Sequence, residues 1–461
     1  MTDRTTPRIL IVDLVGLAMG PDGLPDHSAV KTHVEARGGV FQQGSARAMP
    51  APEPGRAHFY YQPMLSTEAE LLAEAGDGLY DAVIAAATFL PKGTRFDLGG
   101  VRIGTGTGNM GSASWGGGDG RGGIAPLMNT PGINARATAQ MVMKALLRVR
   151  PDLPVDEMNA LVAAGRFDTG TDLVRFPTAK LEGRTFAVIG YGNIGREVAK
   201  LARAFGMTVR IFARPHHRAW IESEGFIHAA SLLEAAAEAD VLSVHVGLGP
   251  LGPEGHANAG LIGADVLSAL AEGAVLINYD RGELVDVPAL AAALSSGRVS
   301  HAAIDADLFR DPSSGALSGP MAPYLSIVPA HGARLSLLPH AAADTDHPTR
   351  VVGAIQAVDQ ILDAIERRVV RNLKGDLPEG YTDAGARTPA GLGGMTAGDL
   401  EELRCDEARM EALRTAAQSI LAALDRLANE GARTAGGDLL LQSNILATLL
   451  RAQSLEGPFQ G

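Results

Sequence analysis

Cysteine and positive charge are both scarce in this sequence, and each shortage excludes a class of protein. The single cysteine, Cys405, allows no internal disulfide and no cluster of thiolate metal ligands. The 12 histidines show no paired spacing of the kind that zinc ligands have. Lys and Arg number 40 against 52 Asp and Glu, a net charge of −12, which argues against a surface for nucleic acid or anionic membranes.

Long apolar runs are also missing. No stretch of about 20 apolar residues occurs, so we expect no membrane span and a cytoplasmic location. The segment MTDRTTPRILIVDLVG has one short apolar run flanked by charge, which favours a buried strand at 8–13 over a signal peptide. Further helices and strands are predicted by their apolar patterns near 28–37, 67–75, 81–87 and 101–104.

Glycine, by contrast, is abundant and unevenly spread. Between Gly104 and Gly123 ten of twenty residues are glycine, and such a stretch disfavours a regular helix. It is either a binding loop lined by backbone or a flexible excursion. A strongly apolar helix is predicted next, over 134–150.

The alternation of strands and helices is clearest from 185 to 331. Apolar runs predict strands at 185–190, 208–212, 240–246, 274–279, 302–306 and 325–330. Helical patterns lie between them, including 194–205, 231–239 and 286–296. Six strands with intervening helices are what a doubly wound nucleotide-binding domain requires. A further helix, near 346–367, has apolar spacing that suits docking on the first domain.

These patterns predict an α/β protein of several domains, because 461 residues are too many for one ordinary core. We expect a first parallel-sheet domain at 1–133, completed by 341–375, and a Rossmann domain at 134–340. The Gly, Pro and Asp content of 376–395 predicts a linker. Leucines at helical spacing predict a helical extension over 396–461, with a second helix near 438–452, which is more typical of an oligomer contact or packing arm than of a catalytic unit.

A dinucleotide motif follows the strand at 185–190. AVIGYGNIG places Gly190, Gly192 and Gly195 in the spacing G-x-G-x-x-G, directly after a strand and at the start of a helix. The first glycine allows a tight turn, the second lets backbone approach a pyrophosphate, and the third permits close helix packing. The helix that begins near Asn193 and Ile194 offers free N–H groups to phosphate.

The end of the next strand indicates which nicotinamide cofactor fits. NAD sites place an acid there for the ribose hydroxyls, whereas this chain continues from Ala213 as Arg-Pro-His-His-Arg. Arg214 and Arg218 could supply charge-assisted donors to a 2′-phosphate. We therefore prefer NADP over NAD; the alternative interpretation is an exposed basic turn on an acidic protein.

Several segments resemble the D-isomer-specific 2-hydroxyacid dehydrogenase family. They are LEGRTFAVIGYGNIGREVA, VLINYDRGELVD, AAIDADLFRDP and IVPAHGA, and NTPGINARATAQ (129–140) resembles the family's hinge segment. The resemblance covers roughly residues 8–373. It implies two doubly wound domains, of which the first, 1–133 completed by 341–375, is a flavodoxin-like substrate domain. It also implies a homodimer formed through the nucleotide domain, and Asp305 among the cofactor-binding residues.

The family uses an arginine, a histidine and an acid, and the resemblance assigns each to a position here. Arg281 follows a strand at its carboxyl end, where a guanidinium can fork to a carboxylate and polarise a carbonyl. His331, expected to end the last strand, would be the acid and base. The family pattern is Pro-His, whereas Ala330 separates Pro329 from His331, and His340 is the alternative.

The acidic partner of the histidine has two candidates. The family places Glu before Pro, and here Asp311 precedes Pro312, one residue later than expected after Asp305. A carboxylate beside the histidine would favour the imidazolium form. Asp307 is the competing candidate.

The resemblance also assigns the substrate-binding loop. GTGTGNMG matches the family's glycine loop, so Gly106, Thr107, Gly108 and Asn109 are expected to meet the substrate carboxylate through backbone N–H groups. Phosphoglycerate-type members present Arg-Ser where this chain has Ala86 and Ala87, with Phe89 close behind. A small or apolar substrate side chain is therefore expected rather than a phosphate.

Together these residues predict hydride transfer between NAD(P)H and C2 of a small 2-oxo or 2-hydroxy acid. The alternative is a nicotinamide-sensing binding or scaffold protein of the same fold whose active site has lapsed. Reduction of an imine instead of a ketone is a second enzymatic possibility.

Overall fold

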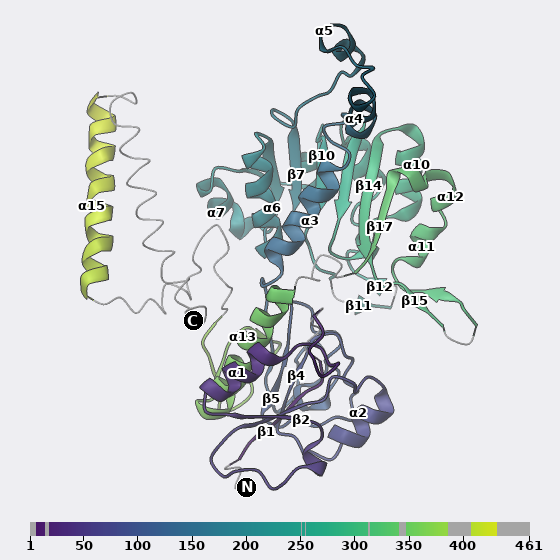
Figure 1. Cartoon of the computed structure of the whole chain (residues 1–461). Helices are drawn as coiled ribbons and strands as arrows, with labels where there is room; N and C mark the ends of the chain where they lie inside the picture. Colours follow the sequence, from purple (N-terminus) through teal and green to yellow (C-terminus); the bar gives the residue numbers. More distant parts are fainter. Residues whose placement is uncertain are drawn as a thin grey trace. The chain divides into compact units, whose positions relative to one another are not determined.

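The computed structural model describes two compact units, each with its own sheet (Figure 1). The first unit comprises residues 1–15, 27–133 and 352–461, and the second comprises 16–26 and 134–351. Within these bounds the structure describes residues 6–13, 18–249, 251–253, 255–311, 314–340, 347–385 and 407–430.

The first unit is built on a seven-stranded sheet in the order β19-β6-β5-β4-β1-β3-β2. Six of these strands are parallel, and β19 pairs antiparallel to β6. The strands are β1 (Arg8–Ile11), β2 (Val40–Gln43), β3 (His58–Tyr61), β4 (Ala82–Ala85), β5 (Gly99–Arg102), β6 (Leu127–Asn129) and β19 (Leu373–Lys374). The central strands are buried, as near-continuous apolar runs in a parallel sheet must be.

Three helices cover this sheet: α1 (Ser28–Ala36), α2 (Glu68–Ala75) and the part of α13 (His347–Glu366) that begins at Val352. Helix α2 starts at a capping box in which Thr67 and Glu70 satisfy each other's backbone N–H groups. Helix α1 buries Val30 and Val34 completely or nearly so, which stabilises the unit by about 1.5–3 kcal/mol per side chain. Polar contacts join α13 to the same unit, including His33 Nε2 to Asp359 Oδ1 at 2.9 Å.

The second unit has a fully parallel seven-stranded sheet in the order β17-β14-β13-β10-β7-β8-β9. Its strands are β7 (Thr185–Ile189), β8 (Thr208–Phe212), β9 (Ile227–Ala229), β10 (Val241–Val244), β13 (Ala274–Asn278), β14 (Val299–Ala306) and β17 (Leu335–Pro339). The chain order reverses between β7 and β10, which creates the switch point where open α/β sheets bind ligands. The predicted fold class, two doubly wound parallel-sheet domains, is confirmed.

Helices cover both faces of the second sheet (Figure 1). They are α3 (Ala135–Leu147), α6 (Asn193–Ala204), α7 (Arg218–Ser223), α8 (Leu232–Ala236), α9 (Ala264–Ala269), α10 (Val287–Ser296), α11 (Ala322–Leu325) and α12 (Val328–His331). One apolar cluster lies on the α3 and α6 side and another on the α8, α9 and α10 side. Helices α4 (Val155–Ala163) and α5 (Thr169–Asp172) extend away from the sheet and bury none of their residues.

One predicted strand is wrong. The run 325–330 forms the end of α11 and most of α12, and the last strand of the sheet is β17. Each of these short helices carries a proline in its first turn, where the missing N–H costs nothing. The run is apolar, as a buried strand would be, but Pro323 just before it and Pro329 within it stand in the first turns of helices.

Beyond β19 the described chain stays with the first unit. Within the predicted linker 376–395, β20 (Thr382–Asp383) pairs with β18 (Val369–Val370), and Tyr381 is buried with Arg368 stacked on its ring. Of the predicted extension 396–461, the structure describes one helix, α15 (Glu407–Glu430). The second helix predicted near 438–452 lies outside the described residues.

Candidate active site

The turn after β7 has the geometry that a dinucleotide-binding motif requires. Gly190 has φ +101°, and a Cβ there would lie 2.2 Å from His245 O. A Cβ on Gly195 would lie 2.1 Å from Gly190 O, so only glycine fits at either position. Gly192, in contrast, has open space around it, which leaves room for a pyrophosphate against its backbone.

Helix α6 begins directly after this turn. The first helical hydrogen bond runs from Arg196 N to Gly192 O at 3.0 Å, so the N–H groups of Asn193, Ile194 and Gly195 belong to the free first turn. These groups and the helix dipole suit an anion. The residues at this turn therefore fit the pyrophosphate of a nicotinamide dinucleotide.

The end of β8 carries exposed positive charge. Arg218 is engaged, because its Nε lies 2.8 Å from Glu222 Oε1. Arg214 is exposed, and its guanidinium has no hydrogen-bond or ion-pair partner among the residues that the structure describes. Of the two arginines predicted to bind the cofactor, Arg218 is paired with Glu222, whereas Arg214 is available to a ligand.

Three side chains meet at the carboxyl edge of the adjacent strands β13, β14 and β17. Arg281 follows β13, Asp305 lies near the end of β14, and His340 follows β17. His340 Nε2 contacts Arg281 Nη1, and His340 Nδ1 lies 3.3 Å from Asp305 Oδ1. The neutral imidazole can satisfy both only with its proton on Nδ1, donated to the carboxylate, and its Nε2 lone pair facing the guanidinium.

Local hydrogen bonds hold each member of this group in place. Asn278 Nδ2 donates to Arg281 O at 2.8 Å, and Arg281 Nη1 donates to Asp280 O at 3.1 Å. His340 N donates to Ala306 O at 3.1 Å, which continues the ladder between β17 and β14 past the end of the strand. The backbone of two parallel strands therefore sets the approach of His340 to Asp305.

The structure does not bring His331 to Arg281, so the sequence-based placement of this histidine is wrong. His331 ends α12 and precedes β17, which puts it at the opposite edge of the sheet from His340. The five residues of β17 separate the two edges by about 16 Å at roughly 3.3 Å per residue. The buried His331 ring instead contacts Ser295 Oγ at 3.4 Å and Arg334 Nη2 at 3.1 Å.

Asp311 is also not brought to the histidine. It lies on a hairpin formed by β15 (Phe309–Arg310) and β16 (Leu317–Ser318), where its carboxylate accepts from the Ser314 N–H at 2.7 Å. Asp311 is exposed at this position. Asp307 is exposed as well. The acid that contacts His340 is Asp305, which the sequence assigned to the cofactor.

Asp280 is a further acidic residue that sequence reasoning missed. It stands immediately before Arg281, and burial raises the pKa of its carboxyl to about 6, an effect that the charges of Arg281 and His340 partly offset. The signal was present in the sequence as NYDRG, but only the arginine of that segment was considered.

The predicted substrate loop lies in the first unit. Thr107 is buried and donates from Oγ1 to Gly118 O at 2.6 Å, while Asn109 Nδ2 donates to Ala86 O and Thr88 O at 3.0 and 2.9 Å. Among the described residues, the N–H groups of Gly106, Thr107 and Gly108 donate to no protein acceptor. The side chains of Thr107 and Asn109 thus hold the loop, and the amides of residues 106–108 are available to an anion.

A neighbouring turn is organised by a residue that the sequence did not single out. The Asp13 carboxylate, at the end of β1, accepts from the N–H groups of Ala86, Ala87 and Thr88 at 2.8, 3.2 and 2.7 Å. Ala86 is fully buried in this turn, whereas Ala87 is exposed and Phe89 is 56% exposed.

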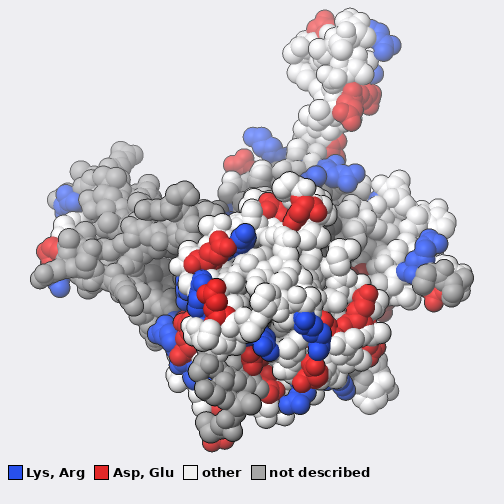
Figure 2. All heavy atoms as spheres, turned by 60° about the horizontal axis from the view of Figure 1, so that its bottom comes forward, with Lys and Arg blue, Asp and Glu red and all other residues white. Residues whose placement is uncertain are grey.

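Other kinds of site find little support in the described residues. They contain no group of three or more His, Cys, Asp or Glu placed to hold a metal ion. None of the helices that the structure describes is long and apolar enough to cross a membrane. On the face shown in Figure 2, described acidic and basic side chains are interspersed in small groups.

The glycine turn, the sheet order and the free helix start together define a nucleotide-binding protein of the Rossmann class. A family model described as the NAD-binding domain of D-isomer-specific 2-hydroxyacid dehydrogenases matches residues 153–316. The chain is 31% identical over 246 residues to a glyoxylate reductase of Aeropyrum pernix, which covers 53% of this chain and 68% of that protein. The chain therefore belongs to the D-isomer-specific 2-hydroxyacid dehydrogenase family.

A second curated relative is matched over a smaller share of its own length, and a solved structure over almost all of it. A D-3-phosphoglycerate dehydrogenase of Methanocaldococcus jannaschii is 28% identical over 55% of this chain, but only 42% of that protein is covered. Among solved structures, a D-lactate dehydrogenase of Treponema pallidum has a TM-score of 0.52 at 17% identity, covering 78% of this chain and 96% of its own. The latter likeness shows a shared fold.

Proposed function

We propose that this protein reduces a small 2-oxo acid at C2 with NADPH, and oxidises the corresponding 2-hydroxy acid in reverse. The observation that carries the proposal is the contact of His340 with both Arg281 and Asp305 at the carboxyl edge of three adjacent strands. An arginine, a proton donor and a carboxylate are the groups that this chemistry needs.

A role for each side chain follows from its position. A bound nicotinamide would supply the hydride. Arg281 binds the substrate carboxylate and polarises the C2 carbonyl, because a guanidinium offers two parallel donors. For reduction, His340 has to carry a second proton, on Nε2, which it gives to the carbonyl oxygen as negative charge develops there; in the reverse direction Nε2 takes that proton back. Asp305 fixes the ring through Nδ1.

The preference for NADP rests on the end of β8. No acid stands there to meet ribose hydroxyls, and the unpaired Arg214 could meet a 2′-phosphate with charge-assisted hydrogen bonds. Arg218 is the weaker candidate because Glu222 already holds it.

The substrate class rests on the first unit. The free N–H groups of Gly106, Thr107 and Gly108 suit a carboxylate, and the small side chains of Ala86 and Ala87 leave no cation for a phosphate. We therefore propose a 2-oxo acid with a small or apolar side chain. The glyoxylate reductase named among the relatives acts, by its name, on an acid of this size.

We further propose that the protein forms a homodimer through an arm at 155–175. Helices α4 and α5 bury none of their residues, yet the arm exposes several apolar side chains: Val155 at 62%, Val162 at 59%, Leu173 at 51% and Val174 at 83%. An exposed apolar arm whose helices bury none of their residues against the described part of the chain suits a second copy.

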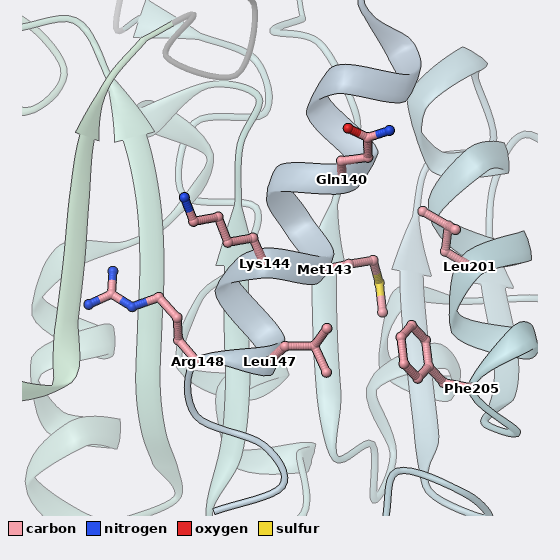
Figure 3. A pocket seen from close by; sticks show the side chains of 7 residues that line it. All are labelled: Gln140, Met143, Lys144, Leu147, Arg148, Leu201 and Phe205. Carbon is pink, nitrogen blue, oxygen red and sulfur yellow. The ribbon is translucent and has the colours of Figure 1, made fainter. Parts of the chain in front are cut away.

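A groove on the same unit offers such an arm a place to pack (Figure 3). Its volume is about 460 Å³, and it is lined by Gln140, Met143, Lys144, Leu147, Arg148, Leu201 and Phe205, from α3 and α6. Val174→Asp should shift the protein from dimer to monomer in sedimentation, because the side chain is too exposed for the change to disturb the monomer. Unchanged sedimentation would remove the arm from the interface.

The activity itself is tested by incubating the protein with NADPH and a panel of 2-oxo acids while following nicotinamide absorbance. We expect turnover with small or apolar members and none with phosphorylated ones. Tight NADPH binding without turnover would support the nicotinamide-sensing alternative. Turnover that depends on added ammonia or amine would indicate imine reduction instead.

A further inference from the structure

The glycine-rich segment from Gly116 to Gly123 packs directly on the proposed carboxylate loop. Gly118 O accepts the Thr107 hydroxyl hydrogen bond at 2.6 Å. A Cβ on Gly118 would lie 2.7 Å from Thr107 O and 2.9 Å from Gly108 Cα, far inside ordinary contact. Both atoms are backbone, so they could make room only if the loop itself moved.

The opposite side of this segment is held equally closely. A Cβ on Gly120 would lie 2.0 Å from Lys374 O, and Asp376 N donates to Gly120 O at 3.0 Å. Asp376 also accepts from Gly122 N at 3.3 Å. The segment therefore fills the space between the carboxylate loop and residues 374–376, which belong to the same unit.

A buried indole fixes the start of the segment. Trp115 is fully buried, stacks on Phe96 with ring centroids 5.9 Å apart, and donates from Nε1 to Met110 O at 2.7 Å. Met110 N in turn donates to Thr107 O at 2.9 Å. The glycine-rich stretch thus packs against the rest of the first unit.

We propose that Gly118 is a positioning residue, which holds the backbone amides of residues 106–108 in the arrangement that receives the substrate carboxylate. The proposal rests on the function proposed above for that loop. Asn109 fixes one end of the loop through Ala86 O and Thr88 O, and Gly118 supports its middle. The amides can then stay free of protein acceptors without the loop collapsing.

Gly118→Ala tests this directly, because Gly118 does not have the positive φ that alone would strain an alanine. We expect the KM for the best 2-oxo acid and the dissociation constant of oxamate, an unreactive analogue, to rise about tenfold to a hundredfold, as loop displacements of roughly 1 Å do. NADPH affinity should stay unchanged, and kcat should fall less than KM rises.

Gly122→Ala is the matched control. Gly122 lies in the same segment with φ +77°, but a Cβ there meets nothing within 4 Å. This variant carries backbone strain without pressing on the loop, so its oxamate affinity should match that of the wild type. An equal loss in both variants, or wild-type affinity in a folded Gly118→Ala protein, would overturn the proposal.

A second pair keeps the test decisive if Gly118→Ala does not fold. Thr107→Val removes the hydrogen bond to Gly118 O, whereas Thr107→Ser retains it. We expect weakened oxamate binding for the valine variant and recovery for the serine variant; equal affinities would count against the proposal. Absence of wild-type turnover with every 2-oxo acid would refute the proposed function, while the oxamate comparison would still judge Gly118.

Discussion

Replacing His340 with Asn, and His331 with Asn for comparison, separates the two histidines that the sequence offered. His340→Asn removes the only ring that contacts both Arg281 and Asp305 within the described residues. His331→Asn removes a buried ring that contacts Ser295 and Arg334 at the other edge of the sheet. Both changes remove an imidazole, so any difference in activity between the two variants reflects where each ring lies in the structure.

The expected sizes follow from these contacts. Loss of a positioned general acid lowers kcat by about a hundredfold to ten-thousandfold. Asp305 Oδ1 lies 3.3 Å from His340 Nδ1 and orients the ring through this contact. His331→Asn should instead cost about 1 kcal/mol of stability through its lost hydrogen bonds.

The assay is steady-state reduction of a 2-oxo acid at saturating NADPH, together with thermal unfolding of each variant. We expect His340→Asn to bind NADPH and to unfold near the wild-type temperature while turnover collapses. His331→Asn should keep kcat and lose a few degrees of Tm. Full activity in folded His340→Asn, or loss of kcat confined to His331→Asn, would refute the reasoning.

Three further predictions concern other residues. Arg281→Ala should lower kcat/KM by about a hundredfold to a thousandfold without changing NADPH affinity. Arg281→Lys should recover only part of kcat/KM, because an ammonium lacks the two parallel donors of a guanidinium. A fully active alanine variant would rule out the role proposed for Arg281. Arg214→Ala should raise the KM for NADPH about tenfold or more and leave that for NADH unchanged, whereas equal effects on both cofactors, or a larger effect from Arg218→Ala, would contradict the assignment. Burial lowers the pKa of His245 to about 3, so the folded protein should lose about 1.4 kcal/mol of stability per pH unit as pH falls from 6.5 toward 3. Urea unfolding at several pH values measures this slope, and His245→Gln should flatten it. An unchanged slope in that variant would contradict the prediction.

The nucleotide domain could be predicted closely because its signals are local. Gly190 and Gly195 are required by contacts to His245 O and Gly190 O, atoms close in sequence or on the adjacent strand of the same motif. Apolar runs gave β7, β8, β10, β13 and β14 within a few residues, since strands buried on both faces must be apolar throughout.

The sequence places the proposed acid and base at His331, whereas the structure favours His340, because two segments compete for the same pattern. Residues 325–330 are apolar and precede His331, while β17 is a shorter apolar run that ends Pro339-His340. The Pro-His pair matched the family pattern without any gap. Only the packing of β17 beside β14, however, shows which run is the strand, because that contact joins residues more than 30 positions apart.

The acid was misplaced for a different reason, which bears on the charge balance of the site. Asp311 lies on an exposed hairpin, so a carboxylate near His340 has to come from another position. Asp305 supplies one at 3.3 Å, and Asp280 adds a second acid whose pKa is raised to about 6 by burial. Against these stands the fixed charge of Arg281. An incoming carboxylate beside Arg281 would add negative charge, which favours the protonated form of Asp280. On the function proposed above, the substrate would therefore bind next to a carboxyl that already holds its proton near pH 6.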